Sequence, residues 1–412
     1  MRFFYFFFFL SFFISAAFSQ RKCGTYNYAQ TQPAYSNNQQ SANSATTSEG
    51  ITRDTLNNEV IIIPVVIHIL YSNTIQNISD AQALSQLAVL NNDYRKMNGD
   101  AANVPAAFKQ FAADARIVFC LSKTDPKGRS TKGIIHKYTT QNRWQANDAI
   151  KFSASGGDDA WDAKKYLNIW VGNLSESTLG YASVPGADAE RDGVVIQYDV
   201  FGNTGNVRSP FNKGRTATHE IGHWLGLKHL WGDALCGDDG ISDTPPQKTY
   251  NTGCSSFPHL STCSVNANGD MFMDFMDFSD DACMYMFTTG QKNKMRSLFA
   301  TGGERNSFLT STGCDSSRPE AGPSLQDSLV KQYTGITIFP NPSSRILNVG
   351  NNTSVVMAGK TALIFNMTGI RILSQQMVSG NNIIHIETLA SGVYILKIGA
   401  GKDQQIIKFI KQ

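Results

Sequence analysis

The segment at residues 218–229, THEIGHWLGLKH, constrains this chain more than any other part of its sequence. His219 and His223 are four residues apart, so on a helix they lie on the same face and can bind one metal ion. Glu220 follows the first histidine, and its carboxylate can therefore reach a water on that metal without binding the metal itself. The segment predicts an active-site helix, and zinc is the natural occupant of such a site.

His229 is the third candidate ligand of this segment. It lies too far beyond His223 to reach the same ion along a straight helix, so the chain must turn sharply, and Gly226 can adopt the positive φ that such a turn needs. Three imidazoles leave the fourth position of a tetrahedral zinc for water, on which Glu220 would act as the general base. The alternatives are ordinary surface histidines, a structural zinc site and a catalytically inactive protein.

The start of the chain has the pattern of a secretory signal peptide, with Arg2 followed by an apolar run over residues 3–18. A membrane anchor is the alternative, but the run is shorter than the roughly 20 residues that a spanning helix needs. We therefore expect a secreted or cell-surface protein. The predicted boundaries are a signal peptide at 1–19, a pro-segment at 20–53, a catalytic domain at 54–314, a linker at 315–335 and a β-rich domain at 336–412.

The hydrophobic patterns of the two domains differ. Residues 60–71 form a continuous β-branched run typical of a buried strand, and residues 79–96 have a capping signal followed by helical spacing. These patterns favour an α+β catalytic domain. Further strands are predicted in this domain at 115–121, 167–171, 179–183 and 193–198. Seven short strands predict a small immunoglobulin-like β-sandwich at the C-terminus, at 336–339, 346–349, 361–366, 370–376, 382–387, 392–398 and 405–410.

The overall charge is close to balanced. The chain of 412 residues carries 36 Lys and Arg against 33 Asp and Glu, a formal net charge of +3. This balance argues against a nucleic-acid-binding protein. Nothing in the sequence requires an oligomer, so we expect a monomer.

The pattern His-Glu-x-x-His-x-x-Gly-x-x-His resembles the metzincin clan of zinc peptidases, and residues 61–296 are similar to its pappalysin branch. The resemblance implies a twisted mixed β-sheet with a backing helix and an active-site helix. It also implies a turn beneath the metal, which Phe275, Met276 and Asp277 match, with Met276 under the three imidazoles. One position departs from the family: pappalysins usually have Tyr where this chain has Phe278, so one hydrogen bond to the transition state is in doubt.

The same resemblance suggests how some of the seven cysteines form disulfides. Export favours disulfides. The resemblance implies Cys236–Cys263 and Cys254–Cys283, and Cys120 could form a third bridge with Cys314. Cys23 is then left in the pro-segment, where its thiolate could block the zinc until the segment is removed, as in several metzincin zymogens. Alternatively, Cys23 bridges Cys120 or Cys314. Arg53 is a reasonable activation cut.

An acidic run after the third histidine resembles the calcium-binding loop of pappalysins. Clustered carboxylates between glycines suit Ca²⁺, and a solvated acidic loop is the alternative interpretation. The candidate ligands are Asp238, Asp239, Asp243 and Thr244.

The resemblance also implies that an extended substrate pairs antiparallel with an edge strand above the zinc, and we expect residues 179–183 to form that edge. Asp280 and Asp281 follow the Met-containing turn and could bind a basic side chain. This would fit the preference of pappalysins for Arg after the scissile bond. Solvated surface carboxylates and calcium ligands are the alternatives.

The last segment resembles the C-terminal sorting domain of the type nine secretion system. A carbohydrate- or protein-binding module that stays attached is the alternative. The matching pieces are IFPNP at 338–342, NMTG at 366–369, LASGVY at 389–394 and the basic end at 408–411.

The sequence as a whole predicts a secreted zinc endopeptidase made as a latent proenzyme. Its partners would be peptide or protein substrates and the secretion machinery, and its cofactors zinc and calcium. A weak or inactive metal-binding or adhesion protein is the alternative from another class. A non-peptide zinc hydrolase is less favoured, because an edge strand and a long cleft suit extended chains.

Overall fold

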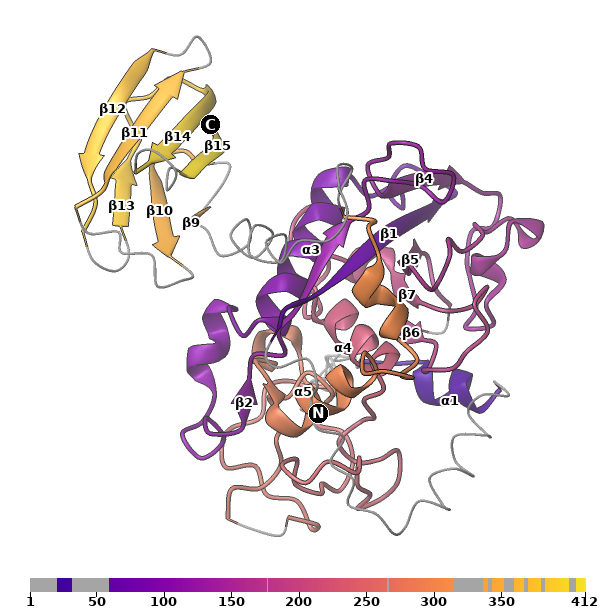
Figure 1. The fold of residues 1–412 in the computed structure, drawn as a ribbon. Helices are drawn as coiled ribbons and strands as arrows, with labels where there is room; N and C mark the ends of the chain where they lie inside the picture. The colour runs from indigo at the N-terminus through magenta and orange to yellow at the C-terminus, as the bar shows by residue number, and fades with distance from the viewer. Residues whose placement is uncertain are drawn as a thin grey trace, which may run out of the picture. The chain divides into compact units, whose positions relative to one another are not determined.

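The computed structural model divides into two compact units, Met1–Arg318 and Pro319–Gln412. The first unit is described at residues 21–31 and 59–314, except 176 and 265–266, and the second at 336–339, 343–351, 359–366, 370–378, 382–399 and 405–412. The predicted signal peptide, the Arg53 cut and the linker 315–335 lie outside these residues. Figure 1 shows helices and a sheet in the first unit and strands in the second.

The first unit is built on a mixed sheet in the order β3-β1-β5-β7-β6, with β4 also paired to β1. Neighbouring strands are parallel except β6, which runs antiparallel to β7 at the edge. Both faces of β1 are buried, as its continuous β-branched sequence predicts. The strands are β1 (Ile61–Tyr71), β2 (Ala112–Ala113), β3 (Ile117–Leu121), β4 (Ile134–Tyr138), β5 (Leu167–Gly172), β6 (Gly180–Ala182), β7 (Val194–Gln197) and β8 (Phe287–Thr288).

The strands predicted in the first unit are therefore confirmed as β1, β3, β5, β6 and β7. We did not predict β4, because its residues are half-buried or exposed and include His136 and Lys137. The two-residue strands β2 and β8, which pair with each other, are too short to give a pattern.

Two helices pack on the sheet, and the second of them carries His219 and His223. Helix α3 (Asp80–Tyr94) begins at Ser79, whose side chain accepts a hydrogen bond from Gln82 N, and α4 (Arg215–Trp224) is buried along its whole length. Tyr94 links the two helices by donating to the carbonyl of Thr218. The remaining helices are α1 (Thr25–Gln30), α5 (Thr289–Ser297) and the short 3-10 turns at Gly99–Asn103, Ala149–Lys151, Ser153–Ser155, Tyr198–Val200, Asp281–Cys283 and Asn306–Thr310.

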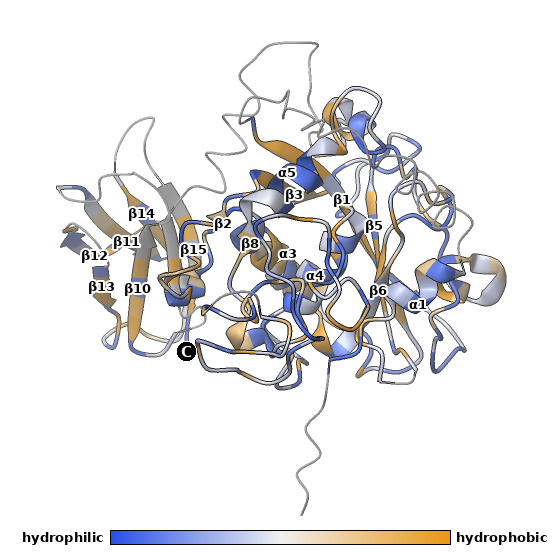
Figure 2. Ribbon diagram, turned by 90° about the horizontal axis from the view of Figure 1, so that it is seen from below, coloured by the Kyte–Doolittle hydropathy of each residue, from blue (hydrophilic) through white to orange (hydrophobic). Residues whose placement is uncertain are grey.

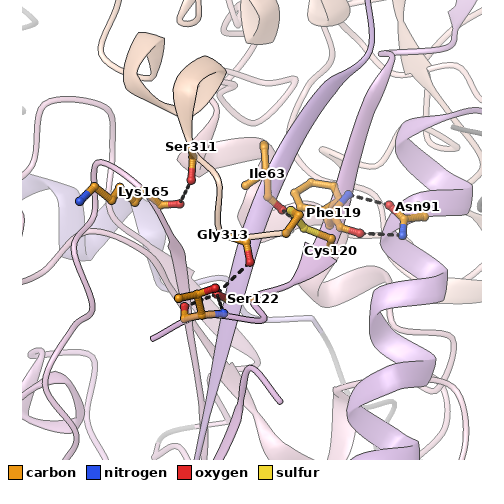
Figure 3. The surroundings of a disulfide bond; sticks show 10 residues. Ile63, Asn91, Phe119, Cys120, Ser122, Lys165, Ser311 and Gly313 are labelled. Atoms are coloured by element: carbon orange, nitrogen blue, oxygen red, sulfur yellow. Dashed lines mark hydrogen bonds between the residues drawn. A yellow bond between two sulfur atoms is a disulfide. The ribbon is translucent and has the colours of Figure 1, made fainter. Parts of the chain in front are cut away.

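Three disulfides link segments of the first unit: Cys120–Cys314, Cys236–Cys263 and Cys254–Cys283. Cys23 is the free cysteine of the seven, all of which are described. Figure 3 shows how the first bridge ties the end of the unit to β3, where Ser122 also donates to the carbonyl of Gly313. The other two bridges hold the long irregular segment between the third histidine and α5, which has little regular structure of its own.

The second unit contains antiparallel strands in two sheets, β13-β10-β9 and β12-β11-β14-β15, so the all-β prediction is confirmed. Its core includes Leu347, Ile364, Ile384, Leu396 and Phe409. Figure 2 shows hydrophobic residues along these strands. The strands are β9 (Ile336–Phe339), β10 (Ile346–Asn351), β11 (Thr361–Asn366), β12 (Arg371–Gln376), β13 (Asn382–His385), β14 (Gly392–Ile398) and β15 (Gln405–Lys411).

Among the described residues, no helix combines the length and the apolar character needed to cross a membrane.

Candidate metal centre

The three histidines of the motif converge on one point. His219 and His223 lie on α4 and point the Nε2 atoms of their buried rings at each other, 3.1 Å apart. His229 Nε2 lies 3.3 Å from the first and 3.1 Å from the second. Nitrogens bound to a tetrahedral zinc at about 2.0–2.1 Å are about 3.3 Å apart, so the three imidazoles fit zinc.

A hydrogen bond on the far side of each ring fixes its orientation. His219 Nδ1 donates to the carbonyl of Phe275 at 2.7 Å, and His223 Nδ1 donates to that of Leu227 at 2.9 Å. His229 Nδ1 donates to Asp233 Oδ1 at 2.5 Å. Each Nε2 is therefore left with a lone pair directed at the common point, as metal ligation requires.

Burial keeps the first two imidazoles neutral. The pKa of His219 and that of His223 lie well below the usual value, mainly because burial disfavours the charged ring and then because neighbouring imidazoles repel a proton. Only a neutral imidazole can ligate a metal through Nε2 while donating from Nδ1.

Gly226 makes the turn that brings in the third histidine. Its φ is 82°, and the helix-ending bonds run from Gly226 N to the carbonyl of His223 and from Leu227 N to that of Gly222. A Cβ at Gly226 would meet no atom closer than 3.5 Å, so the backbone conformation and not the space explains the glycine.

Met276 lies beneath α4, fully buried. A Cβ built on Gly222 would come within 2.5 Å of its sulfur. The helix can therefore approach the methionine only because residue 222 has no side chain. This contact agrees with the predicted place of Met276 under the imidazoles.

We expect Gly222→Ala to lower the free energy of unfolding by about 1–3 kcal/mol, because the added methyl group would displace the Met276 side chain in a packed core. Thermal unfolding measures this effect. Gly99→Ala is the matched control, since a Cβ there meets nothing within 4 Å. Equal stability of the two variants would contradict the packing argument.

Glu220 is buried beside the histidines and is bound by the N-terminal segment. Thr25 Oγ1 donates to its Oε2 at 2.7 Å, and the Cys23 thiol donates to the same oxygen at 3.5 Å. Burial raises the pKa of Glu220 to about 7, and these hydrogen bonds lower it in part.

The segment around Cys23 adds to the edge of the sheet. Leu179 N donates to the carbonyl of Lys22 at 2.9 Å, and Gly24 N donates to that of Gly180 at 2.8 Å, in a parallel bridge. The Cys23 sulfur lies with the three histidine nitrogens in a group whose ligand atoms are all within 4.8 Å of one another. Four candidate ligands are therefore brought together, and the N-terminal segment covers the metal centre.

Asp281, predicted for the substrate pocket, is fully buried and pairs with Arg21 of that same segment. Arg21 donates to Asp281 Oδ1 at 2.5 Å, to the carbonyl of Ser279 and to Thr216 Oγ1. Asp280 lies nearby but is only partly buried. With Arg21 in place, Asp281 is therefore not exposed to solvent.

The four predicted calcium ligands do not converge in the structure. Asp239 Oδ1 accepts from Thr244 Oγ1, but Asp243 accepts from Thr288 Oγ1 and Gly290 N at the start of α5. Asp238 accepts from the nearby backbone N–H of Gly240. Within the described part of the chain, the group of three or more His, Cys or acidic residues close enough to hold a metal is that of Cys23 and the histidines.

Within the part of the chain that the structure describes, Oδ2 of Asp239 and Oδ2 of Asp274 are buried beside this loop without a hydrogen bond. Burial raises the pKa of Asp239 to about 7. It also holds the pKa of Asp274 well above its usual value, to which the negative charge of Asp239 contributes. Asp274 was absent from the predicted set, although it directly precedes the Met-containing turn.

Sequence reasoning also missed Asp233, Arg21 and Thr25. Asp233 is four residues beyond His229. An acidic residue so close in sequence to a metal-binding histidine could have been predicted to accept a hydrogen bond from its other ring nitrogen. The contacts of Arg21 and Thr25 join positions about 200 residues apart or more, which no local pattern reveals.

We expect Asp233→Asn to weaken zinc binding about 10- to 100-fold, because the amide is a poorer acceptor for His229 Nδ1–H. Competition with a fluorescent chelator measures the affinity. Asp188→Asn, at an exposed aspartate, serves as the control. An unchanged affinity in the first variant would show that His229 needs no carboxylate to hold its orientation.

The chain matches known families in both units. The family model described as pregnancy-associated plasma protein-A, a peptidase family, matches residues 153–300, and that of the secretion system C-terminal sorting domain matches residues 337–412. An extracellular metalloprotease of Verticillium alfalfae is 37% identical over 146 residues, 33% of this chain and 50% of that protein. The chain thus spans about half the length of this curated relative.

Solved structures cover the first unit more fully. Tannerella forsythia mature mirolysin in complex with a cleaved peptide is 49% identical, with a TM-score of 0.60 over 61% of this chain and 96% of that chain. A promirolysin mutant of the same organism is 45% identical, with a TM-score of 0.65 over 70% of this chain and 97% of that chain. The α+β architecture is therefore that of a metzincin.

Proposed function

This chain belongs to the pregnancy-associated plasma protein-A family of metallopeptidases, the pappalysins, and it is a secreted or cell-surface protein. We propose that it is a zinc endopeptidase made as a latent proenzyme. The observation that carries this proposal is the convergence of three oriented, buried imidazoles next to Glu220.

In the proposed mechanism His219, His223 and His229 hold the zinc and Glu220 is the general base. When bound, zinc polarises the attacking water and stabilises negative charge on the carbonyl oxygen. The Glu220 carboxylate takes a proton from that water and passes it to the nitrogen of the leaving amine.

A peptide substrate would bind along β6. The edge of this strand already forms backbone hydrogen bonds with residues 22 and 24, so it is able to accept an extended chain. The side chain after the scissile bond would then reach toward Asp281, which would favour Arg. The pairing of Arg21 with Asp281 supports this preference, because it shows that a guanidinium fits there.

We expect Asp281→Asn to reduce the preference for Arg over Leu after the scissile bond by about tenfold, because a buried charged hydrogen bond is replaced by a neutral one. The ratio of kcat/KM for two matched peptides measures the preference. Asp280→Asn, at the neighbouring and less buried carboxylate, is the control. A loss in the control alone would move the pocket to Asp280.

Latency would come from Cys23 as the fourth zinc ligand. Arg21, Cys23 and Thr25 would together fill the substrate pocket, the metal position and the hydrogen-bonding capacity of the general base. Removal of residues 20–53, for instance after Arg53, would free all three. The signal peptide at 1–19 and the catalytic domain at 54–314 belong to the same proposal.

Calcium would bind in the loop of Asp238, Asp239, Asp243 and Thr244. The free buried oxygens of Asp239 and Asp274 support a cation there, since buried carboxylates without partners are costly. The loop would have to rearrange for Asp243 to take part, because both its oxygens now bind the start of α5.

The second unit would direct the chain to the secretion machinery as an immunoglobulin-like sandwich at 336–412, after the linker 315–335. Deleting residues 336–412 distinguishes a sorting domain from a binding module. Loss of export with intact hydrolysis supports a sorting domain, and intact export with impaired hydrolysis supports a binding module. We propose a monomer without nucleic-acid partners.

Hydrolysis of gelatin and of an Arg-containing quenched peptide tests the proposed function. The full chain, after activation, should cleave both, lose cleavage on chelation and regain it with zinc. Bound zinc without cleavage of either substrate would favour an inactive metal-binding protein.

A further inference from the structure

A second apolar cluster lies on the face of the sheet opposite the metal centre. Val195 and Trp170 belong to this cluster, whereas their neighbours Val194, Ile196 and Ile169 belong to the core that includes α4. Successive side chains of a strand point to opposite faces, so the two clusters lie on either side of the sheet. The members of the second cluster are Tyr28, Leu70, Trp144, Ile150, Trp170, Leu174, Tyr181 and Val195.

Tyr28 is the member of this cluster that comes from the N-terminal segment. It lies on α1, which packs beside β6 (Figures 1 and 2). Tyr28 is 3% exposed, and its ring lies 4.9 Å from that of Tyr181, which follows the edge residue Gly180. The segment therefore crosses the edge strand, with Cys23 on the metal side and Tyr28 on the other.

The Tyr28 side chain ends against polar groups. The Tyr28 hydroxyl donates to Asp148 Oδ2 at 2.7 Å, and Arg191 lies 3.2 Å from the same oxygen. Lys151 Nζ lies 2.8 Å from Asp148 Oδ1 and 5.1 Å from the centre of the Tyr28 ring. Asp148 is 1% exposed and Lys151 is fully buried, so the chain holds a buried ion pair where the phenol ends.

The backbone at Asp148 has a φ of 67°, an unfavourable conformation for a residue other than glycine. It directs the carboxylate to the phenol at the start of the turn Ala149–Lys151. Such a position is retained where a specific contact depends on it.

Helix α1 has only 6 residues, too few to be stable alone. Its buried side chains are Thr25, Tyr28 and Ala29. Tyr28 is the large one, and Thr25 also holds α1 by accepting from Ala182 N and donating to Glu220.

We propose that this pocket, formed by Trp144, Ile150, Trp170, Leu174 and Tyr181 with Asp148 at its end, is a binding site for a phenol. Tyr28 fills it in the latent chain. Removal of the segment opens it to a tyrosine side chain of a peptide, at a place separate from the metal centre. Phenylalanine binds more weakly, because it lacks the hydroxyl that donates to Asp148, although Arg191 and Lys151 still pair with that carboxylate.

The test uses the full chain with Tyr28→Ala, which empties the pocket, and two probes of the same shape, p-cresol and toluene. Calorimetry with the zinc chelated should show p-cresol binding at least about tenfold more tightly than toluene. Hydrogen exchange should show that p-cresol restores protection of the α1 amides. The unsubstituted chain should bind neither probe.

Asp148→Asn in the Tyr28→Ala chain should remove the preference for p-cresol. Tyr28→Phe keeps the ring but lacks the hydroxyl. The α1 amides of this variant should exchange faster than those of the unsubstituted chain and slower than those of Tyr28→Ala. This variant tests the hydroxyl even if Tyr28→Ala is poorly folded. The proposal would be overturned if p-cresol and toluene bound the Tyr28→Ala chain equally, or if p-cresol bound the unsubstituted chain as tightly as the Tyr28→Ala chain. None of these readouts depends on peptide hydrolysis, so the proposed function can fail while this site stands.

Discussion

Glu220→Gln should lower kcat/KM for peptide hydrolysis by about 10²- to 10⁴-fold while one zinc remains bound per chain. The amide has nearly the shape of the carboxylate but cannot take a proton from water. It also leaves the imidazole hydrogen bonds of His219 and His223 intact, because Glu220 is not a partner of either ring. Peptide kinetics and metal analysis of the same preparation check both parts.

Glu190→Gln, at an exposed glutamate of the same unit, is the matched control and should leave both quantities unchanged. If Glu220→Gln lost its zinc, the loss of activity would say nothing about a general base. Full activity with bound zinc would contradict the role of Glu220 in proton transfer.

Cys23→Ser should raise the active fraction of the full chain by about one to two orders of magnitude. A thiolate on zinc is at least as strong as a hydrogen bond between charged groups, worth roughly 1.5–3 kcal/mol, and a hydroxyl replaces it poorly. The other contacts of the segment, at Arg21 and Tyr28, would still hold it in part. Initial rates of peptide cleavage before any processing measure the fraction.

Lys22→Ser, at the exposed neighbour, separates the thiol from a general loosening of the segment. Equal activation by both substitutions would mean that Cys23 does not block the metal. Unchanged latency in Cys23→Ser would assign the blockade to Arg21 and Tyr28.

The metal centre could be predicted because its parts are local. His219, Glu220, His223, Gly226 and His229 lie within one turn-and-helix segment, where spacing determines geometry. The buried strand β1 was predictable for a similar reason, since a continuous β-branched run suits a strand covered on both faces.

Contacts between distant segments were not predictable in this way. Arg21 meets Asp281 across 260 positions, and Tyr28 meets Asp148 across 120. The carboxylates of Asp238, Asp239 and Asp243 are the reverse case: they are close in sequence, yet Asp243 is bound by the start of α5. Composition identifies an acidic loop, but only the fold decides where each carboxylate points.

X-ray absorption at the zinc edge tests the central claim most directly. The latent full chain should show three nitrogen neighbours at about 2.0–2.1 Å and one sulfur at about 2.3 Å, and activation should replace the sulfur by an oxygen. Four nitrogen or oxygen neighbours in the latent chain, or a sulfur that persists after activation, would contradict the account.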